Sequence, residues 1–259
     1  MTVSIDLAER IEIEAYTDFA TAARDIATRR IGSALALAVG DDPTCFWCKA
    51  GGFETLTHLA EVCDFFQSTG VAEASLAIAP DKLPTNWPET VQRLGLTEGE
   101  RKVKMAAEVD EVTTHSTLDP ALRVAPVQRQ DADQWATVMM TTFEMPDMAG
   151  MAAAALGRPN WHSYAVWEGA EIVAVASSFS YQGATNMFGG ATVPRARARG
   201  AQSALLATRA KVAQQDGTRW LVAETEADPR NPSLRNLHRA GFHPLYERTT
   251  WLWHRSTSA

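Results

Sequence analysis

The sequence predicts an α/β protein made of two similar domains. The chain has 259 residues, of which 46% are hydrophobic and 21% are charged, a composition typical of globular proteins. This length is above that of an average domain and suits either one barrel-sized domain or two compact ones. Strand-like and helix-like segments recur in the same order in both parts of the chain, which favours two compact domains.

An internal repeat becomes visible when the chain is shifted by 146 residues. The shift places residues 93–96 on residues 239–242, so that Gly95 matches Gly241. A glycine after a helix is a common stop signal, so a chance match remains an alternative. Three further pairs of strand-like or helix-like segments coincide without a gap: 75–78 with 221–224, 87–94 with 233–240, and 101–106 with 247–252.

The polar, threonine-rich residues 109–120 separate the repeats and predict a linker or a crossover strand. We therefore divide the chain into domains at residues 1–116 and 117–259. Residues 5–28 carry an apolar stripe that predicts one or two amphipathic helices. In the second repeat, the patterns predict strands over 122–127, 161–167, 171–179 and 184–193, a strand-like run over 221–224, and helices over 131–143, from about 203 to 215, and over 233–240.

Two features of the second repeat point to a ligand. The pair Gly189-Gly190 inside a strand predicts a bulge or the close approach of another backbone or a ligand. Arg195, Arg197 and Arg199 precede Gly200 at a turn that opens a helix. Such a turn directs unpaired amides to one point, and the helix dipole adds positive potential there. The turn predicts a site for a diphosphate or phosphorylated nucleotide, and a solvated basic helix entrance is the alternative.

The segment from Arg197 to Leu206 resembles the coenzyme-A pyrophosphate motif of the GCN5-related N-acetyltransferases, R/Q-x-x-G-x-G/A. Gln202 departs from it, because the family prefers Gly or Ala there. The family continues with a strand, a loop, a helix and a Gly-Phe pair, which Gly241-Phe242 matches. The resemblance covers about residues 122–253. It implies two tandem domains, each with a mixed, mostly antiparallel sheet flanked by helices, of which the N-terminal one is degenerate.

The resemblance also implies acetyl-CoA as the co-substrate and a set of residues around it. A backbone amide near residues 191–193 would polarise the thioester carbonyl. Asn231 precedes Pro232 and suits the N-cap of a helix better than a direct contact. The implied cofactor-binding residues are Ala191, Val193, Arg197, Arg199, Gly200, Ala201, Gln202, Ser203, Asn231 and Ser233.

For catalysis, Glu224 ends an apolar run where two strands of the family fold diverge, which makes it the candidate general base, acting directly or through water. A structural acid at a strand end is the alternative. Many family members carry a Tyr that protonates the leaving thiolate, but Leu237 stands at this position. His238 beside it points about 100° away on a helix and is not a simple substitute.

The first repeat lacks the basic turn. The shift lays residues 51–55 over 197–201, where no arginine is present and Glu54 would meet a phosphate. We expect this domain to support or complete the acceptor pocket instead. Cys45-x-x-Cys48 lies in an apparent strand over residues 44–49, where residues three apart face opposite sides, so no metal or redox site is expected.

The composition excludes several function classes. A net charge of −7 and a pI near 5.4 argue against non-specific binding to nucleic acid or anionic membranes. Three cysteines, the absence of a secretory start and the lack of a long apolar run favour a cytoplasmic protein without disulfides. The predicted function is acetyl-CoA-dependent N-acylation of a small amine, and a non-catalytic CoA-binding or ligand-sensing protein is the alternative. The acceptor stays open, and so does a homodimer.

Overall fold

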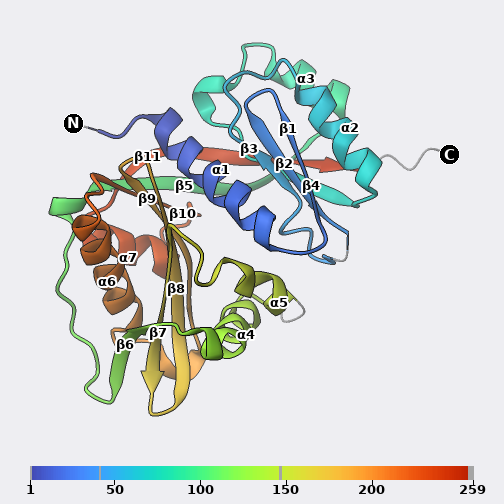
Figure 1. Ribbon diagram of the computed structural model, residues 1–259. Coiled ribbons are helices and arrows are strands. Elements are labelled where there is room, and N and C mark those ends of the chain that lie inside the picture. The colour runs from blue at the N-terminus through green and yellow to red at the C-terminus, as the bar shows by residue number, and fades with distance from the viewer. Residues whose placement is uncertain (1, 41, 146–147, 256–259) are drawn as a thin grey trace. The chain divides into compact units, whose positions relative to one another are not determined.

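The computed structural model in Figure 1 describes residues 2–40, 42–145 and 148–255. The chain forms two compact units, which we call the N-terminal unit (Ile5–Val103 and Tyr246–Ala259) and the C-terminal unit (Met1–Ser4 and Lys104–Leu245). Two long strands, β5 (Thr97–Glu108) and β11 (His243–His254), each contribute residues to both units. The boundary predicted between residues 116 and 117 separates sequence repeats rather than packing units, and it stays a prediction.

The N-terminal unit is a mixed sheet with helices, in the strand order β1-β2-β3-β4-β11-β5. Strands β3 and β4 are parallel, whereas β1 with β2, β2 with β3, and β4 with β11 are antiparallel. Its remaining elements are α1 (Ile5–Ala22), β1 (Ile26–Ile31), β2 (Ala34–Val39), β3 (Lys49–Gly51), α2 (Leu59–Thr69), β4 (Glu73–Leu76), η1 (Pro80–Lys82) and α3 (Trp87–Leu94).

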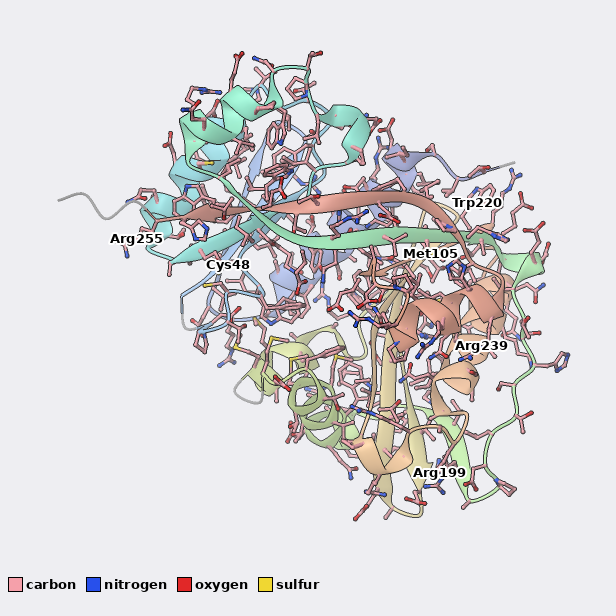
Figure 2. All side chains as sticks on the ribbon, turned by 180° about the vertical axis from the view of Figure 1, so that it is seen from behind. Cys48, Met105, Arg199, Trp220, Arg239 and Arg255 are labelled. Atoms are coloured by element: carbon pink, nitrogen blue, oxygen red, sulfur yellow. The ribbon has the colours of Figure 1, made fainter. Side chains whose placement is uncertain are left out.

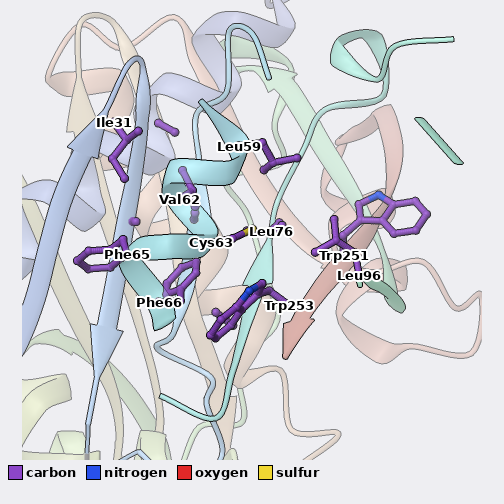
Figure 3. Close-up of a cluster of buried hydrophobic side chains, with 14 of the residues drawn as sticks. Ile31, Leu59, Val62, Cys63, Phe65, Phe66, Leu76, Leu96, Trp251 and Trp253 are labelled. Carbon is purple, nitrogen blue, oxygen red and sulfur yellow. The ribbon is translucent and has the colours of Figure 1, made fainter. Parts of the chain in front are cut away.

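The core of this unit includes the last strand of the chain. Val62 and Phe66, four residues apart on one face of α2, pack in the same cluster as Trp251 and Trp253 of β11 (Figure 3). Strand β11 pairs with β4, where Trp251 lies opposite Leu76. The strand that ends the second repeat therefore completes the sheet that the first repeat begins.

The C-terminal unit has the strand order β5-β10-β9-β8-β7-β6. Strands β9 and β10 are parallel, and the pairs β6 with β7, β7 with β8, and β8 with β9 are antiparallel. Its elements are η2 (Val109–Glu111), β6 (Leu122–Pro126), η3 (Arg129–Asp131), α4 (Ala132–Thr142), α5 (Ala149–Ala152), η5 (Ala153–Ala155), β7 (Trp161–Glu168), β8 (Glu171–Tyr181), β9 (Ala184–Thr192), η6 (Pro194–Ala196), α6 (Ala201–Gln215), β10 (Trp220–Glu226) and α7 (Pro232–Ala240).

The tandem arrangement predicted from the 146-residue shift is confirmed. The bounds of β5 and β11 differ by 146 at both ends, and α3 and α7 precede them. Gly95 and Gly241, also 146 apart, both end their helices in the left-handed conformation, with φ of 63° and 102°. Each repeat thus places a parallel strand pair, a helix and a long final strand in the same order.

The amphipathic helix predicted within residues 5–28 is confirmed over Ile5–Ala22 and ends earlier than expected: Asp25 adopts a left-handed φ of 62°, and the chain then enters β1. Another local prediction in the first repeat was wrong. The apparent strand over residues 44–49 is a turn up to Cys48. The Asp42 carboxylate accepts hydrogen bonds from the amides of Thr44 (2.9 Å) and Trp47 (2.8 Å), which folds the segment back on itself.

Cys45 and Cys48 therefore do not lie on opposite faces of a strand. Both thiols are free. The amide of Cys48 donates to the carbonyl of Cys45 at 3.0 Å. Burial raises the pKa of the Cys48 thiol to about 11, so that it is protonated at neutral pH and a poor nucleophile or ligand. No cluster of three metal-ligating side chains occurs among the residues that the structure describes.

Candidate functional site

Two parallel strands of the C-terminal unit stop pairing before they end, and we call this divergence the opening. The ladder between β9 and β10 joins Ala184–Met187 to Trp220–Ala223 in the described part of the chain, and both strands continue beyond it. Parallel strands that stop pairing leave backbone amides and carbonyls available to a ligand. The family resemblance predicts a site at this divergence.

The glycine pair in β9 forms a bulge, as the sequence predicts. Ala191 lies opposite Val175 and Phe188 opposite Ser177, so the two glycines face a single residue of β8. Gly189 has a φ of 57°, which a side chain would strain. The bulge bends β9 directly after its ladder with β10 ends.

Glu224 is the first residue of β10 beyond the paired segment. Its side chain is 21% exposed, and its Oε2 lies 3.2 Å from Nζ of Lys104 on β5, whose side chain is fully buried. The carboxylate is thus at the opening, where the sequence placed the candidate base. Lys104 was missed, because nothing in its local sequence distinguishes it from the other lysines of its strand.

The turn before α6 presents backbone amides, as predicted. Gly200 is the N-cap with a φ of 82°, and no side chain caps the helix. The first helical bond runs from the Ala204 amide to the Gly200 carbonyl (3.0 Å). The amides of Ala201, Gln202 and Ser203 therefore precede the intrahelical ladder and form the positive end of the helix dipole.

Gly200 is required by the chain itself. A Cβ atom at this position would come within 2.0 Å of the backbone oxygen of Thr117. Together with the left-handed φ, this excludes a side chain at residue 200 even when nothing is bound. The glycine therefore cannot be taken by itself as evidence of a ligand.

The three arginines of the turn differ in their surroundings. Arg199 donates from Nε to Asp119 (2.8 Å) and forms an ion pair through Nη1 with Glu168 (2.7 Å). The Asp119 and Glu168 carboxylates raise the pKa of Arg199, and Arg199 lowers the pKa of Glu168. Arg195 also pairs with Glu168, at 2.7 Å. Figure 2 shows Arg199 at the ends of the long strands, away from Met105 on β5.

Arg197 is exposed, and no carboxylate of the described residues forms such a pair with it. Its Nε donates to the carbonyl of Thr192 at 3.3 Å. The geometry therefore divides the two predicted contacts: Arg197 remains available to an anion, whereas Arg199 ties the turn to Asp119 and to the end of β7.

Gln202, which departs from the family motif, connects the helix to β9. Its side-chain amide donates to the carbonyl of Ala191 (2.9 Å) and to the hydroxyl of Thr192 (2.8 Å). A Cβ atom on Gly190 would lie 2.8 Å from its Oε1. The larger side chain is accommodated because the neighbouring residue of β9 is glycine.

The amide of Val193 is engaged within the fold, contrary to its expected part in polarising a carbonyl. It donates to the carbonyl of Val173 on β8 at 3.0 Å. Because amides alternate between the two edges of a strand, the Thr192 amide faces the edge toward β10. Thr192 is thus the better candidate for a donor in this stretch.

Helix α7 begins as the sequence predicts. The Asn231 side chain accepts a bond from the Ser233 amide (2.9 Å) and donates to the hydroxyl of Thr225 (2.9 Å), which confirms its preferred role as an N-cap. Leu237 is buried, whereas His238 is exposed. The helix supplies no hydroxyl at the position where the family commonly has Tyr.

A buried arginine that the sequence analysis missed supports the bulge. Arg209 of α6 donates from Nη1 to the carbonyls of Ser177 (2.8 Å) and Phe188 (3.2 Å). Burial lowers the pKa of this guanidinium to about 10. Its partners lie on β8 and β9 beside Gly189, so it holds the two bulged strands together.

Comparison with solved structures identifies the architecture. An N-acetyltransferase of the GCN5-related kind from Kribbella flavida matches 98% of this chain and 97% of its own with a TM-score of 0.70 at 15% identity. An acetyltransferase of the same family from Novosphingobium aromaticivorans covers 98% and 100% (TM-score 0.61, 16% identity). A tandem protein of this kind from the clavulanic acid biosynthesis pathway covers 98% and 95% (TM-score 0.64, 10% identity).

The chain therefore has the tandem GCN5-related N-acetyltransferase fold, as the motif in the second repeat predicts. No family model and no curated protein sequence matches the chain. Among the described residues, no helix combines the length and the apolar character needed to cross a membrane.

Proposed function

We propose that the protein is an acetyl-CoA-dependent N-acyltransferase for a small primary amine, and that its site lies in the C-terminal unit. The observation that carries this proposal is the position of Glu224, which is the first residue beyond the β9–β10 ladder. A carboxylate at an opening between strands, near backbone amides, is a suitable base for acyl transfer.

The residues of the turn fit the diphosphate of CoA. The amides of Ala201, Gln202 and Ser203 supply the helix N-terminus, and Arg197 adds a charged donor. The predicted contacts of Ala191, Asn231 and Ser233 belong to this proposal. Gly200 shapes the turn and Arg199 orients it. The bound thioester supplies the activated acyl carbon.

The transfer needs a base that takes the proton of the acceptor and a source of a proton for the leaving thiolate. The acceptor nitrogen forms a bond to the acyl carbon while Glu224 takes its proton, and the carbon–sulfur bond breaks. The thiolate leaves with the electron pair and takes a proton from solvent. A thiol pKa of about 8 to 9 makes this leaving group adequate without the acid that Leu237 replaces.

The test is thiol release from acetyl-CoA offered together with primary amines of different classes, such as spermidine, tyramine, lysine and kanamycin. We expect release that depends on at least one amine and acetylation of that amine detectable by mass spectrometry. Stoichiometric binding of acetyl-CoA without release, across an extended amine library, would favour the ligand-sensing alternative, which the buried Leu237 supports.

The reduced state of the three cysteines is compatible with a cytoplasmic location.

A further inference from the structure

Lys104 is the feature of the C-terminal unit that the pattern of the fold does not explain. It is fully buried, although lysine is among the residues most rarely found in protein interiors. Burial of an ammonium group is unfavourable unless an opposite charge compensates it. The ion pair with Glu224, at 3.2 Å, supplies such a charge.

The repeat shows that the fold does not need this ion pair. The 146-residue shift places Thr250 at the position of Lys104, and Ile78 at the position of Glu224. Ile78 is buried in the N-terminal unit. The same architecture is thus built once with a threonine and an isoleucine and once with a lysine and a glutamate. The charged version occurs in the C-terminal unit, which also has the arginine-rich turn.

We propose that Lys104 is a positioning residue for the acyl transfer, which holds Glu224 ionised and in place at the opening between β9 and β10. This inference rests on the proposed function. A buried ammonium near a carboxylate favours the ionised form of the carboxylate, and the contact also restricts its rotamers. Lys104 acts through Glu224 and is not itself assigned a contact with substrate.

The proposal gives the first repeat a part in the site. Lys104 belongs to β5, the strand that ends the first repeat, although its packing assigns it to the C-terminal unit. The degenerate repeat lacks an anion-binding turn of its own but supplies the counter-ion of the candidate base. The supporting role expected of the first repeat is thus assigned to one side chain, Lys104, which can be tested.

The test is a double-mutant cycle in the full chain with Lys104→Met, Glu224→Gln and the double variant, assayed with acetyl-CoA and the amine that gives the fastest wild-type thiol release. Lys102→Met is the matched control, because Lys102 lies two residues away on β5 and pairs instead with Glu100. We expect Lys104→Met to lower kcat at least about tenfold, with the KM for acetyl-CoA changed by less than about twofold. The double variant should match Glu224→Gln within about twofold, because each change disables the same group.

Normal kcat in a folded Lys104→Met variant would overturn the proposal, as would a double variant slower than Glu224→Gln by the full factor of Lys104→Met. If Lys104→Met does not fold because the partly buried Glu224 carboxylate loses this counter-ion, the double variant, which removes both charges, decides. Turnover within about twofold of Glu224→Gln supports the proposal, and turnover at least about tenfold slower overturns it. Absence of amine-dependent release by the wild type would overturn the proposed function and this inference together. Wild-type turnover with an unaffected Lys104→Met would overturn the inference alone.

Discussion

The two repeats share the same arrangement of strands and helices but carry different side chains at equivalent positions. In the second repeat, the parallel pair β9 and β10 diverges beside a glycine bulge and Glu224. In the first repeat, β3 and β4 pair over only two positions, and Ile13 of α1 packs against the glycines that follow: a Cβ on Gly52 would come within 2.7 Å of Ile13 Cγ1. A hydrophobic side chain thus fills the end of the N-terminal strand pair.

The two repeats also differ in the charged residues near these strand pairs. Arg197 and Arg199 of the second repeat correspond to Gly51 and Phe53 in the first. The fold supplies the strand pair and the helix, whereas the side chains on this backbone decide whether the unit can bind an anion and move a proton.

The largest effect is expected at Glu224. Glu224→Gln keeps the shape of the side chain but removes the base, and we expect kcat to fall by about 100- to 10,000-fold. Acetyl-CoA affinity should stay close to the wild type, whereas the thermal midpoint should fall, because the buried ammonium of Lys104 loses a counter-ion. Glu226→Gln, two residues further along β10 and exposed, is the control in the same thiol-release assay. Unchanged turnover in Glu224→Gln would leave positioning and backbone polarisation as the mechanism.

A variant of Ile13 tests whether the filled end of the β3–β4 strand pair is alone what keeps the first repeat from binding acetyl-CoA. Ile13→Ala removes a buried side chain and should lower the free energy of unfolding by about 2–4 kcal/mol, as large-to-small core changes do. Chemical denaturation measures this change. Because the first repeat lacks the arginines as well, the variant should not acquire a second acetyl-CoA site. Binding of two equivalents per chain would show that Ile13 alone blocks the degenerate repeat.

Arg197 tests the anion-binding turn. Arg197→Ala should weaken acetyl-CoA binding by about 5- to 30-fold, because one charge-assisted hydrogen bond is lost. The thermal midpoint should hardly change, since this side chain is exposed. Dephospho-CoA retains the diphosphate and serves as the control ligand. Its affinity should fall by the same factor in Arg197→Ala. Wild-type affinity in Arg197→Ala would remove this residue from the site.

Arg199 should show the smallest effect, on the pH dependence of stability. The hydrogen bond from the Ala121 amide and then that from Arg199 lower the pKa of Asp119 from its ordinary value of 3.8. Arg199 is the main cause of the lowered pKa of Glu168, whose ordinary value is 4.5. Carboxyls with lowered folded-state pKa values stabilise the protein above their unfolded-state pKa values, and this stabilisation is lost as the pH falls through the folded-state values.

Arg199→Ala should therefore have a lower thermal midpoint than the wild type near neutral pH, and the difference should shrink as the pH falls below about 4. Thermal scans across this range measure it, and Arg197→Ala provides the control without such a carboxylate pair. A difference that is constant with pH would mean that the ion pairs of Arg199 do not contribute to stability.

The sequence predicts much of this site because its signals are local. The Asn231-Pro232 cap, the Gly189-Gly190 bulge and the left-handed Gly200 follow from the conformations that these residue types favour. Distant partners could not be predicted. Asp119 lies 80 residues from Arg199, and Lys104 reaches Glu224 because β5 lies beside β10 in the sheet. The turn at residues 42–48 was missed because the Asp42 side chain overrides the apparent strand pattern.

The stoichiometry of acetyl-CoA binding tests the difference between the repeats most directly. Isothermal titration calorimetry of the full chain measures the number of sites together with their affinity. We expect one site per chain, weakened in Arg197→Ala and retained in Glu224→Gln, because only the second repeat combines the amides of α6 with an available arginine. Two equivalent sites per chain, or no binding at all, would contradict the account.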